Sequence, residues 1–336
     1  MSYGNSYPLV TVVTPSYNQA DFLEQTMCSV FGQDYPAIEY LVIDGASTDE
    51  SINVIEKYAS SLHWWVSEPD DGQADAINKG LRKAKGEVVA WLNSDDLYLP
   101  GAVSSAVEAL LANPDLGLVY GDAITIDING KPINKLVFPQ WNLEDLMAFR
   151  IICQPAVFMR REVLEKAGFL NETLHFMLDH QLWLRIAALA PIQHIPSMLA
   201  AARHHPSAKN VSQAEQFSRE TYDVLAWMEN QPEMVDIINM NRRRILAGAY
   251  RLSARYLLDG ELYTEALTTY GRALITQPGY ALQHWHRILY ALLCLVGVSG
   301  LDEWYYQKRM RKNVDLSSDL DLNGWAGLKL DGKTID

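Results

Sequence analysis

The sequence predicts an α/β fold, in which a mostly parallel sheet has helices on both faces and is followed by an α-helical C-terminal region. Apolar strand patterns alternate with helical patterns from residue 9 to about residue 115, as in parallel sheets covered on both sides. After about residue 213 only helical patterns remain. The chain has 336 residues, 49% of them hydrophobic, which allows a substantial core and favours two domains. We therefore expect an α/β domain over residues 1–212 and a helical region over residues 213–336.

The elements of the α/β domain follow one another at short intervals. The expected strands lie at 9–14, 38–44, 63–69 and 87–93, and the expected helices lie at 20–31, within 45–60, at 72–86 and at 100–114. Residues 117–133 are predicted to form a hairpin that turns at Asn129-Gly130. Beyond Phe138 the pattern becomes helical, with a single short apolar strand at 155–160.

Composition narrows the class of protein. Lys and Arg number 28 and Asp and Glu number 41, so the formal net charge is −13. Such an acidic chain is a poor candidate for binding nucleic acid, which requires a basic surface. Three widely separated cysteines argue against a disulfide framework or a zinc motif, and the N-terminus shows no secretory signal pattern. We therefore expect a cytoplasmic protein.

The C-terminal region leaves two interpretations open. Two helical segments joined at Gly260 resemble one tetratricopeptide-type hairpin, although an ordinary packed helical pair is favoured over a partner-binding repeat. The most apolar run, 288–301, is too short to span a bilayer and favours a buried helix. The alternative is a helix in a membrane interface, because aromatic residues and the basic run "QKRMRK" follow it. Contact with a protein, or peripheral contact with the inner face of the cell membrane, is therefore left open for these helices.

Polar residues gather where the predicted strands end. They are Thr14 to Tyr17, Asp44, Glu68 to Asp71 and Asn93 to Asp96. Ligands of open α/β sheets bind outside the carboxyl ends of the strands, so these groups should converge on one crevice. Carboxylates that close would repel one another, and Mg²⁺ or Mn²⁺ together with a polyphosphate would offset that repulsion. No glycine-rich phosphate loop is present in the sequence, which argues against an ordinary dinucleotide or P-loop site.

Three segments, Val10–Ser51, Gly72–Asp96 and Phe176–Arg185, resemble the family 2 glycosyltransferases. The resemblance covers roughly residues 8–210 and depends on several motifs that occur in the expected order. It implies the GT-A fold, which is Rossmann-like. It also implies a metal-dependent, inverting transfer of sugar, with Mn²⁺ or Mg²⁺ as the cofactor. The donor would be a UDP-, GDP- or dTDP-sugar and the acceptor a glycan, a glycolipid or a protein-linked glycan, as in the synthesis of cell-surface polysaccharides.

The resemblance also implies roles for individual residues. It assigns Asp179 as the catalytic base, and it assigns the metal to Asp95, with Asp96 beside it. His205, or alternatively His204, lies on a segment that folds over the donor and would meet the metal or the pyrophosphate. The residues that it assigns to the donor are Thr14, Pro15, Ser16, Tyr17, Asp44, Asp71, Gly72, Asp75, Asn78, Lys79, Asn93 and Ser94. Asn93 stands where the family usually has the first acid of its Asp-x-Asp motif, so the metal should rest mainly on Asp95. Gln154 and Pro155 are expected to border the acceptor site.

Two other functions compete with this interpretation. One is a catalytically inactive protein that binds a sugar or a partner, and the presence of both Asp95 and Asp179 argues against it. The other is a sugar-phosphate nucleotidyltransferase. That class usually has a glycine-rich loop containing arginine after its first strand, where this chain has "TPSYNQ".

Overall fold

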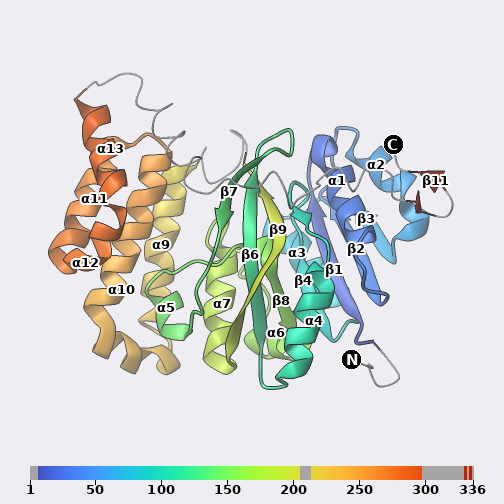
Figure 1. Ribbon diagram of the computed structural model, residues 1–336, viewed down its shortest axis with the longest axis horizontal. Coiled ribbons are helices and arrows are strands. Elements are labelled where there is room, and N and C mark those ends of the chain that lie inside the picture. Colours follow the sequence, from blue (N-terminus) through green and yellow to red (C-terminus); the bar gives the residue numbers. More distant parts are fainter. Residues whose placement is uncertain (1–6, 205–212, 297–328, 331–332, 335–336) are drawn as a thin grey trace.

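The computed structural model of the protein describes residues 7–204, 213–296, 329–330 and 333–334. One large sheet lies beside a bundle of helices (Figure 1). The strands of that sheet are β1 (Val10–Ser16), β2 (Ile38–Asp44), β3 (Trp64–Ser67), β4 (Val88–Trp91), β5 (Leu97–Tyr98), β6 (Leu118–Ile126), β7 (Pro132–Leu136), β8 (Val157–Arg160) and β9 (Ile192–Arg203). The strands β10 (Lys329–Leu330) and β11 (Lys333–Thr334) form a separate two-stranded sheet.

The large sheet is parallel at one end and mixed at the other. Its order is β3-β2-β1-β4-β8-β6-β9-β5, with β7 paired to β6. The strands β3, β2, β1 and β4 are parallel, β8 is antiparallel to both of its neighbours, and β6 is parallel to β9. The predicted hairpin is confirmed as β6 and β7, with Gly130 in the left-handed region at φ 81°.

The expectation of a single strand beyond Phe138 is wrong. Besides β8, the twelve-residue strand β9 pairs in parallel with β6 and antiparallel with β5. Its register on β6 shifts around Asp122, and its sequence contains Pro196 and a run of three alanines, so it lacks the alternation typical of a strand.

Helices cover both faces of the sheet. The helices of the α/β region are α1 (Ala20–Phe31), α2 (Ser51–Lys57), α3 (Gln73–Lys83), α4 (Ala102–Ala112), α5 (Leu143–Met147), α6 (Arg161–Ala167) and α7 (Leu178–Leu189). One apolar core joins α1 and α4 to one face, and a second joins α3 and α7 to the other. On α3, a Cβ atom at Gly80 would lie 2.4 Å from Val13 Cγ1, so glycine is what lets this helix approach β1 closely.

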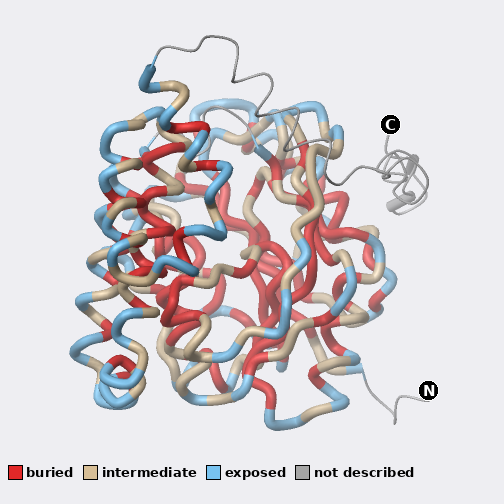
Figure 2. The backbone as a smooth tube through the Cα atoms, turned by 60° about the vertical axis from the view of Figure 1, so that its left-hand side comes forward, coloured by how far each residue is buried: buried red, intermediate tan, exposed pale blue. Residues whose placement is uncertain are grey.

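The C-terminal region consists of α9 (Ala214–Met228), α10 (Pro232–Asp259), α11 (Tyr263–Thr276), α12 (Pro278–Ala281) and α13 (Trp285–Leu295). The predicted helical pair across Gly260 is confirmed as α10 and α11. Apolar residues of α9 and α10, including Phe217, Val224 and Ile245, belong to the same core as α3 and α7. Figure 2 shows buried residues running through the sheet and through the helices. The division of the chain at residue 212 stays a prediction, since one core joins the two sides.

The helix α13 is only half buried. Tyr290 and Ala291 pack against α10 and α11, whereas Leu289, Leu292 and Leu295 are exposed. The prediction of a buried helix is therefore wrong for this face, and residues 297–301 of the same apolar run lie outside the described residues. No helix in the described part of the chain is both long enough and apolar enough to cross a membrane.

Candidate active site

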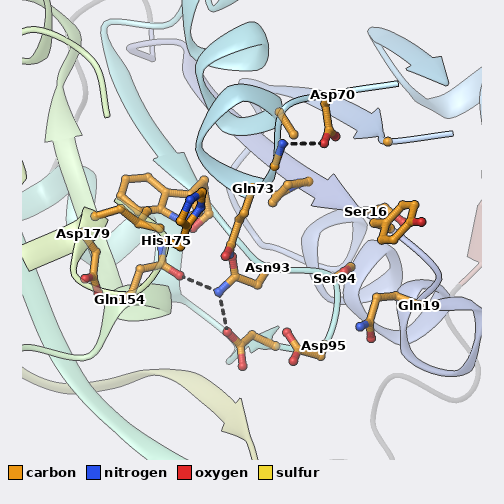
Figure 3. Close-up of a pocket in the computed structure, with 18 of the residues that line it drawn as sticks. Ser16, Gln19, Asp70, Gln73, Asn93, Ser94, Asp95, Gln154, His175 and Asp179 are labelled. Carbon is orange, nitrogen blue, oxygen red and sulfur yellow. Dashed lines mark hydrogen bonds between the residues drawn. The ribbon is translucent and has the colours of Figure 1, made fainter. Parts of the chain in front are cut away.

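A pocket of about 930 Å³ opens at the carboxyl ends of the parallel strands. Residues that follow β1, β2, β3 and β4 all line it, as expected for a sheet of this kind. In Figure 3 Ser16 and Gln19 lie on one side of the pocket and Asp179 lies on the other. Of the predicted site residues, those lining the pocket are Pro15, Ser16, Tyr17, Gly72, Asn93, Ser94, Asp95, Asp96, Gln154 and Asp179.

The end of β1 presents a hydroxyl group to the pocket. Ser16 is 3% exposed, and its Oγ atom has no hydrogen-bond partner within the described structure. A buried hydroxyl without a partner is costly, so this atom is available to a ligand. Thr14, by contrast, shares a hydrogen bond of 2.9 Å with the Tyr40 hydroxyl and lies behind the pocket.

Asp44 shapes the turn that follows β2. Its fully buried carboxylate accepts hydrogen bonds from Ser47 N at 2.9 Å, Ser47 Oγ at 2.5 Å and Ser67 Oγ at 2.7 Å. The residues of this turn that line the pocket are Gly45 and Ala46, and Ala46 is held at φ 61°. Asp44 therefore supports the pocket wall from behind, and its predicted contact with the base of the donor stays a prediction.

Asp70, which was predicted from the sequence only as part of the run Glu68 to Asp71, lines the pocket, whereas its neighbour Asp71, predicted to contact the donor, does not. Its Oδ1 atom accepts a hydrogen bond of 2.9 Å from Gly72 N. A Cβ atom at Gly45 would lie 2.5 Å from Asp70 Oδ2, so the glycine leaves room for this carboxylate. Both acids stand in the same sequence motif, and only the path of the backbone after β3 decides which of them faces inward.

Three predicted residues on α3 hold the helix in place and do not line the pocket. Lys79 pairs with Glu68 at 3.2 Å and with Asp75 at 3.3 Å. The buried Asn78 side chain donates to Leu170 O and accepts from Leu170 N, both at 2.9 Å. The predicted donor contacts of these residues stay predictions, and the structure gives each a structural partner.

Asn93 connects the two sides of the pocket. Its Oδ1 atom accepts from Gln73 Nε2 at 2.9 Å, and its Nδ2 atom donates to Gln154 Oε1 at 3.1 Å and to Asp96 Oδ2 at 3.4 Å (Figure 3). Gln154 Nε2 in turn donates to Trp91 O at 2.8 Å. A carboxylate at position 93 could not donate to Asp96, so the amide suits this position.

Asp95 and Asp96 have different surroundings. Asp96 is buried, and its Oδ1 atom accepts from Arg203 N at 2.9 Å. Burial and the charge of Asp95 raise the pKa of Asp96 well above its ordinary value. Asp95 lines the pocket next to Ser94.

Arg203, a residue that was not singled out from the sequence, holds the loop of these two acids. From the end of β9 its guanidinium donates to Asp95 O at 2.9 Å and to Gln25 Oε1 at 2.8 Å. It also donates to the carbonyl oxygens of Asp127 and Ile128, at 3.1 and 3.0 Å. It could not have been recognised without β9, which brings it to this loop.

Replacing Arg203 by lysine is expected to destabilise the protein, because an ammonium group cannot reproduce the planar set of donors. We expect the free energy of unfolding to fall by roughly 2–3 kcal/mol, as for other buried charged groups that lose hydrogen bonds. Urea unfolding of Arg203→Lys would measure this, with Arg82→Lys at an exposed position as the control. Equal stability of the two variants would show that Arg203 does not hold the loop.

The residues present fit a divalent cation. Within the described ranges, no three His, Cys, Asp or Glu side chains gather closely enough to hold a metal by themselves. Mg²⁺, however, is usually held by one or two carboxylates together with substrate phosphates. Asp95 and Asp96 both line the pocket, and after burial as the main cause the charge of Asp95 raises the pKa of Asp96, so a cation would offset the repulsion between the two carboxylates. His205 lies outside the described residues, and His204 is exposed.

Asp179 lies in the first turn of α7, on the far side of the pocket from Ser16 (Figure 3). Its Oδ1 atom accepts a hydrogen bond of 2.6 Å from His180 N. Burial raises the pKa of Asp179 to about 6, despite the opposing effect of that hydrogen bond. A carboxylate with this pKa can take up a proton near neutral pH, which is what a general base requires.

Two stacked tryptophans connect the strand β4 to the helix α7, which carries Asp179. Trp91, at the end of β4, lines the pocket and stacks on Trp183 of α7 with ring centroids 5.2 Å apart. His175, Phe176 and Phe217 complete the wall near Asp179. Phe217 comes from α9, so the helical region contributes to the pocket.

Comparison with known proteins gives one consistent result. The family model described as "Glycosyl transferase family 2" matches residues 11–168. An uncharacterized glycosyltransferase of Rickettsia felis is 31% identical over 209 residues, which cover 59% of this chain and 34% of that protein. The O-antigen biosynthesis protein RfbC of Myxococcus xanthus is 30% identical, over 60% of this chain and 16% of that protein. The putative teichuronic acid biosynthesis glycosyltransferase TuaG of Bacillus subtilis is 31% identical, over 47% of this chain and 64% of that protein.

Solved structures share the fold. Residues 1–349 of S. aureus TarS in complex with UDP-GlcNAc give a TM-score of 0.56 at 17% identity, with 83% of this chain and 92% of that chain covered. The mannosyltransferase PcManGT from Pyrobaculum calidifontis, in complex with GDP-Man and Mn²⁺, gives 0.57 at 21% identity, with 86% of each chain covered. The chain spans about one third of the length of three of the rickettsial relatives, those of Rickettsia felis, Rickettsia conorii and Rickettsia bellii. The family resemblance of the sequence is confirmed: the chain contains a glycosyl transferase family 2 domain, and that domain has the GT-A fold.

Proposed function

We propose that the protein transfers a sugar from a nucleotide-sugar donor to a hydroxyl group of an acceptor, with inversion at the anomeric carbon. One observation carries this proposal. A single pocket is lined by Asp95, in the loop after β4, and by Asp179, whose pKa is raised to about 6. The unpartnered Ser16 hydroxyl adds a polar group available to a ligand at the end of β1.

The proposed reaction is a single displacement. The acceptor oxygen attacks the anomeric carbon and forms the new glycosidic bond, while the bond from that carbon to the phosphate oxygen breaks. Asp179 accepts the proton of the attacking hydroxyl. Asp95 would hold Mn²⁺ or Mg²⁺, with Asp96 behind it, and when bound the cation would stabilise the charge of the departing nucleoside diphosphate.

The names of related proteins support the substrate classes. Two proteins of the same fold were solved with UDP-GlcNAc and with GDP-Man and Mn²⁺, which supports a UDP- or GDP-sugar as the donor, while a dTDP-sugar stays a prediction from the sequence. RfbC and TuaG are named for the biosynthesis of O-antigen and teichuronic acid, which supports a glycan or glycolipid acceptor in polysaccharide synthesis. We propose a cytoplasmic protein whose C-terminal helices contact either a protein or the inner face of the cell membrane, the two alternatives that the sequence left open.

A panel of UDP-, GDP- and dTDP-sugars with Mn²⁺ tests the proposal. We expect nucleoside diphosphate to be released from one donor, faster when acceptor glycans are present. Binding of a nucleotide sugar with no release from any donor would favour the inactive binding protein. Release of pyrophosphate from a nucleoside triphosphate and a sugar phosphate would favour the nucleotidyltransferase.

The pH dependence of transfer follows from Asp179. The base must be ionised, so its raised pKa predicts that kcat/KM rises with pH through about 6 and then levels off. At pH 5 only about a tenth of the carboxyl groups are ionised, so kcat/KM should be roughly tenfold below its plateau. Rates between pH 4.5 and 8 measure this, with donor affinity determined at each pH. A flat profile would show that no group of this pKa is needed.

A further inference from the structure

Glu220, on α9, binds the segment that leads into the proposed base. Its Oε1 atom accepts a hydrogen bond from His175 N at 2.8 Å, and its Oε2 atom accepts from Phe176 N at 2.8 Å and from Met177 N at 2.9 Å. These three successive amides come immediately before α7, which begins at Leu178. One carboxylate from the helical region therefore holds three backbone groups of the α/β region.

Burying a carboxylate is unfavourable unless hydrogen bonds compensate for the water that it loses. Glu220 is 7% exposed, and within the described part of the chain it forms no ion pair. Its charge is compensated by the three amides, of which Met177 N belongs to the N-cap residue of α7 and lies at the positive end of that helix. Charge-assisted hydrogen bonds of this kind are about twice as strong as neutral ones.

The held segment belongs to the pocket. His175 and Phe176 both line it, and Asp179 follows Met177 by two residues. One turn before Glu220 on the same helix, Phe217 also lines the pocket and lies 4.9 Å from the Phe176 ring, measured between centroids. Phe217 stacks in turn on Tyr256 of α10 at 4.2 Å. The helical region therefore contacts residues 175–177 through the hydrogen bonds of Glu220 and through the Phe217 ring.

We propose that Glu220 is a positioning residue for Asp179, through which the helical region sets the place of the catalytic base. This inference depends on the proposed function, because it assumes that Asp179 is the base. It gives α9 and α10 a role in catalysis that the matched family segment, residues 11–168, does not include.

Glu220 also acts on Asp179 through its charge. Within the described structure, the groups that interact with that carboxyl include the His180 amide on α7, Glu220 on α9, Tyr256 on α10, and Cys153 before β8. After burial as the main cause, the negative charge of Glu220 contributes to the raised pKa of Asp179. Removing that charge should therefore make Asp179 a weaker base that ionises at lower pH.

The test compares Glu220→Gln and Glu220→Ala with Glu215→Gln, a change at an exposed position of the same helix. Hydrogen exchange of residues 175–177 reports the hydrogen bonds directly, without any activity. UDP or GDP with Mn²⁺ serves as the probe of donor-site binding, and release of nucleoside diphosphate reports kcat, KM and their pH profile. For Glu220→Gln we expect faster exchange at 175–177 and a kcat reduced roughly 3- to 10-fold. The acid limb should move to lower pH by roughly half a unit, while nucleotide affinity stays within about twofold.

Each outcome decides the matter. Faster exchange with an unchanged kcat and pH profile would overturn the positioning role, and so would a loss of nucleotide affinity in proportion to kcat. Normal exchange at 175–177 in Glu220→Ala would show that the carboxylate does not hold the segment. An inactive wild-type protein would overturn the proposed function instead, and it is distinguishable because the exchange result does not depend on turnover.

Discussion

Replacing Asp179 by asparagine is expected to lower the rate of sugar transfer by about 10²- to 10⁴-fold, the usual contribution of a general base. Asparagine keeps the size of the side chain and can still accept from His180 N, but it cannot take the proton of an acceptor hydroxyl. Donor affinity should stay within about twofold, because the removed group is a proton acceptor and not a donor ligand. Steady-state kinetics, together with calorimetry using UDP or GDP, would measure the two effects separately.

Asp179→Asn should raise the stability of the protein near neutral pH, although it lowers the rate of transfer. Since the folded protein raises the pKa of Asp179 from its ordinary 3.8 to about 6, folding disfavours the ionised form. The contribution of Asp179 to stability is therefore fully present below its ordinary pKa of 3.8 and is lost as the pH rises through about 6. Above pH 6 the variant should be more stable than the wild type by about 1–3 kcal/mol, and well below pH 3.8 the two should be equal.

A matched control for Asp179→Asn is Asp115→Asn, which changes an exposed carboxylate outside the pocket. It should alter neither transfer nor its pH dependence. If Asp179→Asn lost donor affinity in parallel with its rate, Asp179 would be a ligand of the donor and the assignment of the base would fail.

Replacing Asp95 by alanine is expected to abolish transfer for a different reason. The variant loses one of the two pocket-lining carboxylates of the proposed metal site, whereas Asp96 still accepts hydrogen bonds from Arg203 N and Asn93 Nδ2. Affinity for UDP or GDP in the presence of Mn²⁺ should fall by about 10- to 100-fold, as is typical when a first ligand or its support is lost. Calorimetry with each nucleotide, with Mn²⁺ and with EDTA, would measure this.

The measurement in EDTA shows whether the effect of Asp95→Ala on nucleotide affinity depends on the cation. In EDTA the wild type and Asp95→Ala should bind nucleotide equally weakly, because the difference between them depends on the metal. An equal loss of affinity in Mn²⁺ and in EDTA would place Asp95 in direct contact with the nucleotide and would contradict the metal assignment.

Much of the α/β architecture could be predicted from local patterns, because buried parallel strands and their helices differ in composition and period. The helix at 20–31 and the strand at 38–44 have the predicted bounds. β9 could not be predicted this way. Its alanines and its proline have no strand preference of their own, and the strand exists because β6 and β5 supply partners on its two edges.

The residues of the candidate site also include some that local sequence patterns predict and some that they do not. Its motif residues, such as Asn93 and Asp95, follow predicted strands, so the sequence places them at one edge of the sheet. The wall near Asp179 depends on Phe217 and on Glu220, which are distant in sequence and look like ordinary helix residues. Likewise, the exposed leucines of α13 have the same local pattern as buried ones, and only the arrangement of α10 and α11 decides which face is covered.

The amide chain across the pocket has a polarity of its own. Gln73 donates to Asn93, Asn93 donates to Gln154, and Gln154 donates to the carbonyl of Trp91, all in one direction. The side-chain amide of Asn93 cannot flip by itself. Its NH₂ group would then face the NH₂ group of Gln73, and its oxygen would face the oxygen of Gln154. The chain therefore behaves as a single cooperative unit that spans the pocket from α3 to the end of β4. A neutral amide at position 93 therefore links Gln73 to Gln154, whereas a carboxylate there could not donate to Gln154 and would end the chain.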